Sequence, residues 1–492
     1  MGKHYIACDL GAESGRVILG TLRDGRLTLE EIHRFANGAT KIQNSLRWNI
    51  IRIFDELKQG LRMVAARGVA ASGMSVDSWG VDYVLFNDRQ PMLGLPYQYR
   101  DARTERTYAA ALENPGRDVI FAETGIQFMA INTLYHLIAD VNENSDLLQI
   151  ADQFLNIADY MNYLFCGVGR AEVSLASTTQ LYNPTTGQWS AELIQRLELP
   201  EEIFPPIVAS GTRLGPLLTE LCDETGLSPV EVIATCSHDT GAAVAAVPAE
   251  GDDWAYLSSG TWSLIGVELP EPRINNDVLA ENFTNEAGLN GTTRFLKNIV
   301  GLWLLQESRR SWSRQGQTLD YTEINQLAEQ AEPFRSLINP DDPRFMSPAD
   351  MPTAIDSYCQ ETNQPVPETP GQYARCILES LALLYGRTLD TVQRLTGRQI
   401  LKLHIVGGGS QSTLLNQLAA NATGRTVYAG PVEATAIGNV LIQAMAMGDL
   451  ESLSELRGVV RDSFSIATYE PESSALWEQT RQRFAEMVRG GK

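Results

Sequence analysis

The stretch that decides the fold lies near the middle of the 492-residue chain and reads Ala234-Thr235-Cys236-Ser237-His238-Asp239-Thr240-Gly241-Ala242-Ala243. The largely apolar residues 230–234 before it predict a strand, and the small residues 242–247 after it predict a helix. Open α/β sheets bind ligands at such strand-to-helix junctions, on the carboxyl edge of the sheet. A lone carboxylate there, Asp239, could accept the proton of a substrate hydroxyl. The simpler alternative, for this stretch taken alone, is that Asp239 only caps the helix.

The composition narrows the class of protein. A chain of 492 residues is long enough for two domains or more. Its 39 Lys and Arg against 60 Asp and Glu give a net charge of −21, which argues against binding to nucleic acid or to an anionic membrane. The start of the chain carries no export signal, and no window has the length and apolar character of a membrane span. We therefore expect a cytoplasmic protein with no nucleic-acid or membrane partner.

The six cysteines give little support to a metal site. None of them stands in C-x-x-C spacing, which disfavours a zinc site or a thioredoxin-like motif. Cys359 and Cys376 flank a proline-rich segment and could lie close together, so a disulfide between them stays open. Reduced, buried thiols are nevertheless the general expectation in the cytosol.

A strand–turn–strand pattern occurs twice. Residues 5–8 and 16–22 predict strands joined by a polar, glycine-bearing turn, and residues 254–257 and 262–267 repeat the pattern about 250 residues later. An Asp-Gly pair at residues 24–25 predicts a hairpin into a third strand. Backbone N–H groups in such turns can bind anions, and Asp9 in the first turn could hold Mg²⁺ through water. The two copies suggest two domains of related fold that grip one phosphate chain from both sides.

A third polar segment interrupts an apolar run at residues 76–82. It holds Asp77, Trp79, Gly80 and Asp82 between a predicted strand at 74–76 and its continuation at 83–86. Indole faces suit the C–H faces of sugars, and carboxylates suit pairs of hydroxyls. A sugar pocket and an ordinary strand with a bulge at Gly80 are equally open alternatives.

Residues 401–406 predict a strand that ends in three consecutive glycines, 407–409, before a helix at 414–420. Such glycines let a flat ligand approach the backbone and leave N–H groups free at a helix N-terminus, although a plain tight turn is the alternative. Elsewhere the pattern predicts a helix that starts near Asn298 and an extended excursion over 333–370, which holds eight of the 22 prolines. It also predicts a long helix over 373–395 closed by Gly397.

Taken together, these segments resemble the FGGY carbohydrate kinases, within the actin-like ATPase superfamily, over essentially the whole chain. The similar segments are residues 9–16, 76–82, 237–240, 257–263, 296–299 and 404–409. The resemblance implies an α/β fold of two duplicated ribonuclease H-like, actin-like ATPase domains with a central cleft. Residues 1–244 would form the sugar-binding domain and residues 245–492 the nucleotide-binding domain.

The resemblance is strongest to the family members that act on L-rhamnulose. It implies ATP- and Mg²⁺-dependent phosphorylation of L-rhamnulose to L-rhamnulose 1-phosphate, in L-rhamnose degradation, by a monomer or small homo-oligomer. By this resemblance Asp239 is the general base and Asp9 lies on the Mg²⁺ side. The implied nucleotide contacts are Ala12, Glu13, Ser14, Gly15, Arg16, Thr261, Gln306 and Gly408. The implied sugar contacts are Gly80, His238, Asp239, Thr240 and Asn298.

Two other functions stay open on the residues themselves. One is a kinase for another ketose or polyol, such as xylulose, ribulose, fuculose or glycerol, since spacing cannot choose among sugars. The other is a non-metabolic actin-like ATPase, a chaperone or filament subunit. That function accounts for both phosphate-type turns and the glycine turn. It does not account for the segment around Trp79 or for an aspartate placed to meet a hydroxyl.

Overall fold

The computed structural model describes residues 2–143, 145–472 and 474–490, and the chain forms two compact units. Unit 1 consists of Met1–Pro248, Glu268–Phe295 and Ala434–Ser463. Unit 2 consists of Ala249–Val267, Leu296–Glu433 and Phe464–Lys492. Each unit is therefore assembled from separate stretches of chain. The predicted domain boundary between residues 244 and 245 stays a prediction.

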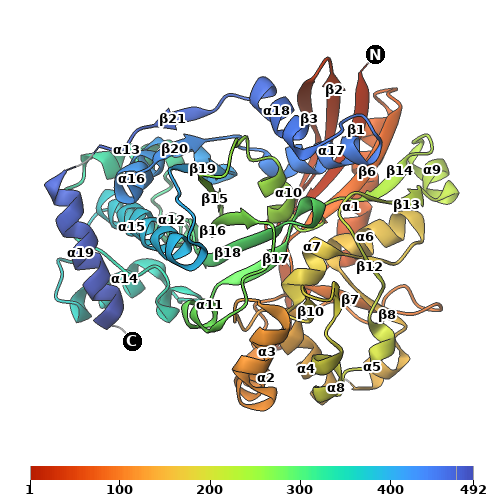
Figure 1. Cartoon of the computed structure of the whole chain (residues 1–492), viewed down its shortest axis with the longest axis horizontal. Helices are drawn as coiled ribbons and strands as arrows, with labels where there is room; N and C mark the ends of the chain where they lie inside the picture. The colour runs from red at the N-terminus through yellow and green to blue at the C-terminus, as the bar shows by residue number, and fades with distance from the viewer. Residues whose placement is uncertain (1, 144, 473, 491–492) are drawn as a thin grey trace. The chain divides into compact units, whose positions relative to one another are not determined.

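Unit 1 is built on a six-stranded sheet of order β13-β14-β6-β1-β2-β3 (Figure 1). The antiparallel meander expected at the start of the chain is confirmed as β1 (Lys3–Leu10), β2 (Ser14–Arg23) and β3 (Arg26–Ala36). Asp24 and Gly25 make the hairpin turn with φ angles of 50° and 73°, which an Asp-Gly pair accommodates. The parallel strands β6 (Ala71–Ser78) and β14 (Glu231–Ala234) follow on the other side of β1, and β13 (Thr212–Pro216) closes the edge.

Helices cover this sheet through regularly spaced apolar residues. In α1 (Ile50–Ala65) the apolar residues Ile50, Ile53, Leu57, Leu61 and Val64 are all buried. Helix α6 (Ile157–Cys166) is buried along most of its length. Helices α10 (Asp239–Ala245) and α17 (Ala434–Ala446) pack against each other although they are far apart in the chain.

The remaining elements of unit 1 are short. Strand β7 (Tyr83–Phe86) pairs with β8 (Gln153–Asn156), so the prediction that residues 83–86 continue β6 is wrong. The polar segment 79–82 therefore links two different sheets. The other helices are α2 (Thr104–Ala111), α3 (Arg117–Thr124), α4 (Thr133–Glu143), α5 (Ser145–Ile150), α7 (Val173–Ala176), α8 (Ala191–Arg196), α9 (Thr219–Thr225), α11 (Asn276–Glu281) and α18 (Leu453–Ser463). The other strands are β4 (Ala39–Ile42), β5 (Ser45–Trp48), β9 (Ala171–Glu172), β10 (Tyr182–Asn183), β11 (Gln188–Trp189), β12 (Ile207–Val208) and β17 (Thr284–Ala287).

A second sheet has seven strands in the order β17-β18-β16-β15-β19-β20-β21, and β15, β19, β20 and β21 lie in unit 2. The second strand–turn–strand pattern is confirmed as β15 (Trp254–Ser259) and β16 (Trp262–Leu269). The other strands are β18 (Thr293–Val300), β19 (Lys402–Val406), β20 (Thr426–Ala429) and β21 (Ala467–Tyr469). Strand β19 runs parallel to β15, so their carboxyl ends meet at one edge of the sheet.

The helices of unit 2 confirm one expectation and correct two. Helix α15 (Pro370–Thr396) matches the predicted long helix and ends at Gly397, whose φ is 71°. The helix predicted near Asn298 is wrong, because Asn298 lies in β18 and α12 (Trp303–Arg314) begins after Gly301. The excursion over 333–370 contains α14 (Met351–Glu361), in which Pro352 occupies the first turn, where no N–H is needed. The other helices are α13 (Tyr321–Gln330), α16 (Thr413–Thr423) and α19 (Ala475–Gly490).

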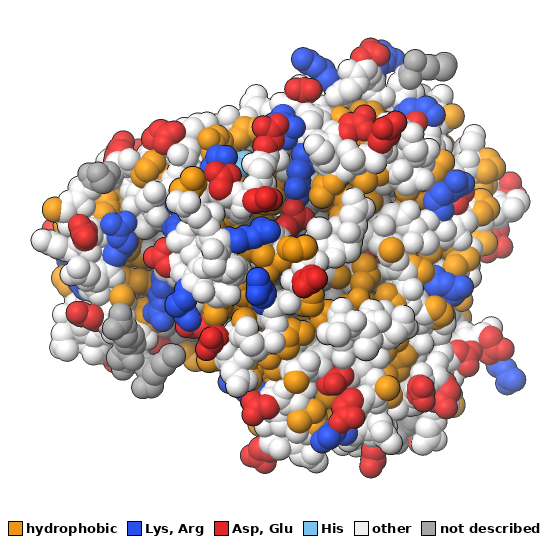
Figure 2. Space-filling model, viewed as in Figure 1, with side chains coloured by type: hydrophobic (Ala, Val, Ile, Leu, Met, Phe, Trp, Pro, Cys, Tyr) orange, Lys and Arg blue, Asp and Glu red, His pale blue; other side chains and the backbone are white. Residues whose placement is uncertain are grey.

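Two general expectations, on the cysteines and on membrane spans, and the distribution of charge can be compared with the structure. All six cysteines are free thiols, and Cys359 and Cys376 are buried neighbours. A hydrogen bond from Cys376 lowers the pKa of Cys359. Among the helices in the described ranges, none combines the length and the apolar character needed to cross a bilayer. Figure 2 shows acidic and basic side chains interspersed on the face in view, so the acidic excess is not gathered there into one patch.

Candidate active site

Asp239 is the first residue of α10, three residues earlier than the predicted helix start. Its Oδ1 accepts hydrogen bonds from the backbone N–H of Thr240 at 2.5 Å and from the Thr240 hydroxyl at 3.2 Å. Its other oxygen, Oδ2, receives no hydrogen bond from the described residues, and its side chain is 31% exposed. The helix-cap alternative is wrong, because His238 stands at the N-cap position of α10 and Asp239 is its first helical residue. Oδ2 of Asp239 is left to meet a ligand.

The surroundings make Asp239 a stronger base than an ordinary aspartate. Its pKa is raised, chiefly because burial disfavours the charged carboxylate. The neighbouring His238 opposes this shift, and the negative charge of Asp9 adds to it. A carboxylate with a raised pKa holds an accepted proton more firmly, which suits a general base.

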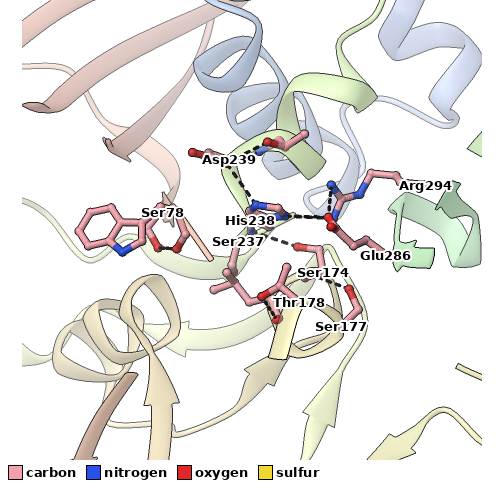
Figure 3. Close-up of polar contacts among 12 residues, drawn as sticks. Ser78, Ser174, Ser177, Thr178, Ser237, His238, Asp239, Glu286 and Arg294 are labelled. Carbon is pink, nitrogen blue, oxygen red and sulfur yellow. Dashed lines mark hydrogen bonds and ion pairs between the residues drawn. The ribbon is translucent and has the colours of Figure 1, made fainter. Parts of the chain in front are cut away.

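The loop before Asp239 is held by buried polar groups from two other segments (Figure 3). Glu172 Oε2 accepts the N–H of Ser237 at 3.0 Å, and Ser174 Oγ accepts the N–H of His238 at 3.1 Å. On the other side, the N–H of Ser78 at the end of β6 donates to the carbonyl of Ser237 at 2.9 Å. These bonds fix the backbone of the loop, so His238 and Asp239 leave it in defined directions.

Three aspartates from different strands and helices influence one another electrostatically. Asp9 of β1 stands opposite Arg16 of β2, with which it forms an ion pair, and beside Asp77 of β6. Asp77 is fully buried; its Oδ2 accepts a hydrogen bond from Asn439 of α17 at 2.5 Å, and its Oδ1 has no partner among the described residues. Burial first, and then Asp9, raise the pKa of Asp77. Sequence reasoning placed Asp77 in a polar segment but did not join it to Asp9 and Asp239.

The first phosphate-type turn is closed by its own backbone. The N–H of Gly11 donates to the carbonyl of Ser14 at 2.9 Å, and the Asn37 side chain holds the carbonyl of Gly11 at 2.8 Å. Gly15 packs under Phe35, because a Cβ at that position would lie 2.2 Å from the ring. The glycine is thus required for packing, while Ala12 is partly buried against the core and Glu13 is exposed.

The segment around Trp79 is arranged differently from an open aromatic platform. The indoles of Trp48 and Trp79 both donate to Asp82 Oδ2, at 2.6 and 2.8 Å, and their ring centroids lie 4.3 Å apart. Burial raises the pKa of Asp82 to about 7. The Asp82 carboxylate and one face of Trp79 are therefore committed to the interior of unit 1. Gly80 lies close to Thr178, since a Cβ there would be 2.9 Å from the Thr178 hydroxyl.

In unit 2 the second turn and the start of α12 are hydrogen-bonded together. The N–H groups of Leu302 and Trp303 donate to the carbonyls of Gly260 and Thr261, at 3.0 and 3.2 Å. This contact places Thr261 next to the first turn of α12, which carries Gln306. The Oε1 atom of Gln306 is buried and has no hydrogen-bond partner among the described residues. An unpaired amide oxygen at such a place is suited to accept a hydrogen bond from a ligand.

The glycine turn after β19 lies at the same sheet edge. Gly407 has a φ of 83°, and a Cβ on Gly409 would lie 2.0 Å from the hydroxyl of Ser259 at the end of β15. Gly408, between them, is exposed, and a Cβ there would meet no atom within 4 Å. Three of the candidate nucleotide contacts, Thr261, Gln306 and Gly408, thus belong to segments at one edge of the unit 2 sheet. Asn298, a candidate sugar contact, is a half-buried residue of β18 in unit 2.

Family models match both parts of the chain. Residues 4–246 match the N-terminal domain of the FGGY family of carbohydrate kinases, and residues 255–447 match its C-terminal domain.

Proteins of known name match it along nearly its full length. A rhamnulokinase of Bacteroides thetaiotaomicron is 45% identical over 489 residues, which cover 99% of this chain and 100% of that one. A rhamnulokinase of Enterococcus faecalis is 42% identical over 469 residues, 95% of this chain and 94% of its own. A ligand-bound xylulose kinase from Lactobacillus acidophilus has a TM-score of 0.82 at 16% identity, with 99% of this chain and 97% of that one covered. This structural likeness confirms the expected α/β fold of two domains.

Proposed function

This chain belongs to the FGGY family of carbohydrate kinases, and we propose that it phosphorylates L-rhamnulose with ATP to give L-rhamnulose 1-phosphate. The observation that carries the choice of sugar is the 45% identity to a rhamnulokinase along 99% of the chain. The reaction would serve L-rhamnose degradation in the cytoplasm, performed by a monomer or a small homo-oligomer.

The proposed mechanism starts from the free oxygen of Asp239. A primary alcohol is a poor nucleophile until its proton has an acceptor, and Oδ2 of Asp239 would take that proton as the hydroxyl attacks the γ-phosphorus. His238 would orient the sugar rather than act as the base. Gly80, Thr240 and Asn298 complete the proposed set of sugar contacts.

The nucleotide would be held by the two turns and the glycine turn. Backbone N–H groups at residues 12–16, with the Arg16 side chain, and Thr261 in unit 2 would bind phosphates. Gln306 and Gly408 would contact the rest of the nucleotide. Phosphoryl transfer depends on alignment and charge neutralisation more than on covalent chemistry by the protein.

Asp9 is the proposed residue on the side of Mg²⁺. Within the described ranges no group of three or more His, Cys, Asp or Glu is arranged to hold a metal. Mg²⁺ in phosphoryl transfer needs only one or two carboxylates in addition to phosphates and water, so the oxygen donors of Asp9 and the neighbouring Asp77 fit such an ion. When bound, the ion would neutralise charge on the phosphates.

The proposed function is tested by ADP release in a coupled assay with L-rhamnulose, L-fuculose and D-xylulose. The proposal expects kcat/KM for L-rhamnulose to exceed that for each of the others by at least ~10-fold, which is about 1.4 kcal/mol of discrimination. Higher kcat/KM with another sugar would assign the chain to a different kinase of the family. ATP turnover that needs no sugar and responds to peptides would point to a non-metabolic ATPase.

Replacing Gly408 by valine should raise the KM for ATP by ~10-fold or more. A Cβ at Gly408 would meet no atom within 4 Å, so the new side chain enters open space, which is the volume proposed for the nucleotide. Steady-state kinetics with varied ATP and isothermal titration with a non-hydrolysable analogue measure the effect. The matched control is Gly94→Ala in unit 1, another glycine with open space around it, for which no change is expected. Unchanged nucleotide affinity in Gly408→Val would leave this glycine as a turn residue only.

A further inference from the structure

We propose that Arg294 and Glu286 form a positioning pair, which holds the His238 imidazole in the tautomer with its proton on Nε2 and so directs that proton toward Asp239. Neither residue is among the predicted contacts of the sugar, the nucleotide or the metal. The consequence for turnover rests on the proposed function, whereas the tautomer itself can be observed without any substrate.

Arg294 is a buried cation with few partners, and one of them is His238 (Figure 3). Its side chain is 0% exposed. The guanidinium donates from Nε to the carbonyl of Ala287 at 3.0 Å, and Nη1 lies 3.1 Å from Glu286 Oε2. Its Nη2 lies 3.1 Å from His238 Nδ1. Since a buried charge is expensive unless it is paired, this arrangement is held together tightly.

The contact between Arg294 and His238 decides which ring nitrogen carries the proton. A guanidinium has five N–H donors, no acceptor, and stays charged in proteins. His238 Nδ1 must therefore accept the hydrogen bond with its lone pair, and the proton of the neutral ring lies on Nε2. That nitrogen lies 3.4 Å from Asp239 Oδ1, so the carboxylate is the nearest anionic neighbour of the Nε2 proton on that side of the ring.

Glu286 alone would favour the opposite tautomer. Its Oε2 lies 3.4 Å from His238 Nδ1, where a carboxylate would attract a proton. Arg294 sits on the same oxygen and neutralises its charge, so the carboxylate holds the guanidinium in place instead of competing for the ring. The two residues therefore act together. Glu286 without Arg294 would draw a proton to Nδ1 of His238, and Arg294 without Glu286 would be a buried charge without a carboxylate partner.

The chosen tautomer separates the two oxygens of Asp239. Oδ1 accepts from the two donors of Thr240 and lies 3.4 Å from His238 Nε2, whereas Oδ2 is left for the substrate hydroxyl. With the proton on Nδ1, a ring lone pair would face Oδ1 and repel it. The sugar would then meet a displaced imidazole and a displaced base.

The first test observes the tautomer directly in the full-length protein. The chain has only five histidines, so selective ¹⁵N labelling of histidine gives few ring signals, and His238→Gln assigns the one in question. At pH 8 the proposal expects an Nε2–H signal with unprotonated Nδ1 for His238. An Nδ1–H or doubly protonated ring in the unaltered protein would overturn it.

The second test separates the two members of the pair. Arg294→Met leaves the Glu286 carboxylate beside Nδ1, so a proton should appear on Nδ1 and kcat with L-rhamnulose should fall by ~10–100-fold. The double variant Arg294→Met/Glu286→Leu removes both charges, which buried pairs often tolerate, and should restore the Nε2–H signal and most of kcat. If Arg294→Met does not fold, Arg294→Gln provides the single change, because it removes the positive charge beside Glu286 but keeps an amide donor for the carbonyl of Ala287.

The matched control is Arg425→Met in unit 2. Arg425 is 8% exposed in its side chain and likewise binds one carboxylate, Asp390, and backbone carbonyls. It should leave the His238 signal unchanged and kcat within twofold. A loss of kcat in Arg294→Met with an unaltered Nε2–H signal, or a double variant no better than the single one, would overturn the proposal. If L-rhamnulose proves not to be the substrate, the ¹⁵N signals of His238 still test the proposed tautomer, because they are measured without substrate.

Discussion

Replacing Asp239 by asparagine should lower kcat with L-rhamnulose by at least ~100-fold, which is the range typical for loss of a general base. The affinity for ATP should stay within about threefold of the wild-type value. The asparagine oxygen can still accept the bond from the Thr240 N–H, so α10 keeps its first turn. What is lost is the negative charge on the second oxygen, which alone can take the hydroxyl proton. Single-turnover phosphoryl transfer and separate nucleotide titration measure the two quantities.

The dependence of kcat/KM on pH at the acid side provides a second test of the Asp239 carboxylate. Because burial raises the pKa of Asp239, its base form is lost on acidification at a higher pH than for an ordinary aspartate. The wild-type kcat/KM should therefore fall toward low pH with a midpoint above the pKa of an ordinary aspartate, and the residual activity of Asp239→Asn should lack that limb. Asp55→Asn on the exposed side of α1 is the control for the chemical change. Near-full turnover in Asp239→Asn would remove this residue from the mechanism.

Replacing Gly438 by alanine should destabilise unit 1 by about 2–4 kcal/mol, at or above the usual range for overpacking. A Cβ at Gly438 of α17 would lie 1.9 Å from the carbonyl oxygen of Ala242 and 2.6 Å from its carbonyl carbon. Backbone atoms cannot rotate away as a side chain can, so the two helices must separate. Because α10 begins with Asp239, kcat should fall together with stability.

The matched control uses the same substitution in a neighbouring helix of the same unit. Gly458 of α18 is also helical, and the nearest atom to its Cβ would be an Arg461 guanidinium nitrogen at 3.7 Å. There alanine should be neutral or stabilise by about 0.5–1 kcal/mol, because glycine costs that much inside a helix. Urea denaturation followed by circular dichroism compares the two variants. Equal midpoints for both would show that α10 and α17 do not need their close approach.

The sequence predicted best those parts of the fold that are specified locally. Alternating strands around Asp24-Gly25 and the apolar stripe of α15 ending at Gly397 carry their own turn and cap signals, and both were predicted correctly. The errors occur where local signals are ambiguous. Residues 293–300 form a short apolar run whose period does not distinguish a strand from a helix. The many prolines of residues 333–370 suggested an extended segment, yet Pro352 is well accommodated in the first turn of α14.

The residues of the candidate site also differ in how far local sequence identifies them. Asp239 could be singled out because the strand, the polar loop and the helix around it follow one another directly in the chain. The pair behind His238 could not, since Arg294 is 56 residues away and precedes an ordinary apolar run. A lone arginine in such a run is the only signal it offers. Residues that orient a site through buried contacts become visible only when distant segments are brought together.

Because unit 1 is assembled from separate stretches of chain, it cannot fold completely until late in translation. Asp77 receives its hydrogen bond from Asn439, 362 positions later, and α17 supplies the surface on which α10 rests. At about 5–20 residues per second, translation needs roughly 20–70 s to cover that interval. During this time the apolar surface that α17 later covers stays exposed, and the Asp77 carboxylate lacks its hydrogen bond from Asn439. The part of the chain that is made first is therefore finished almost last, and molecular chaperones have their longest opportunity to act on it.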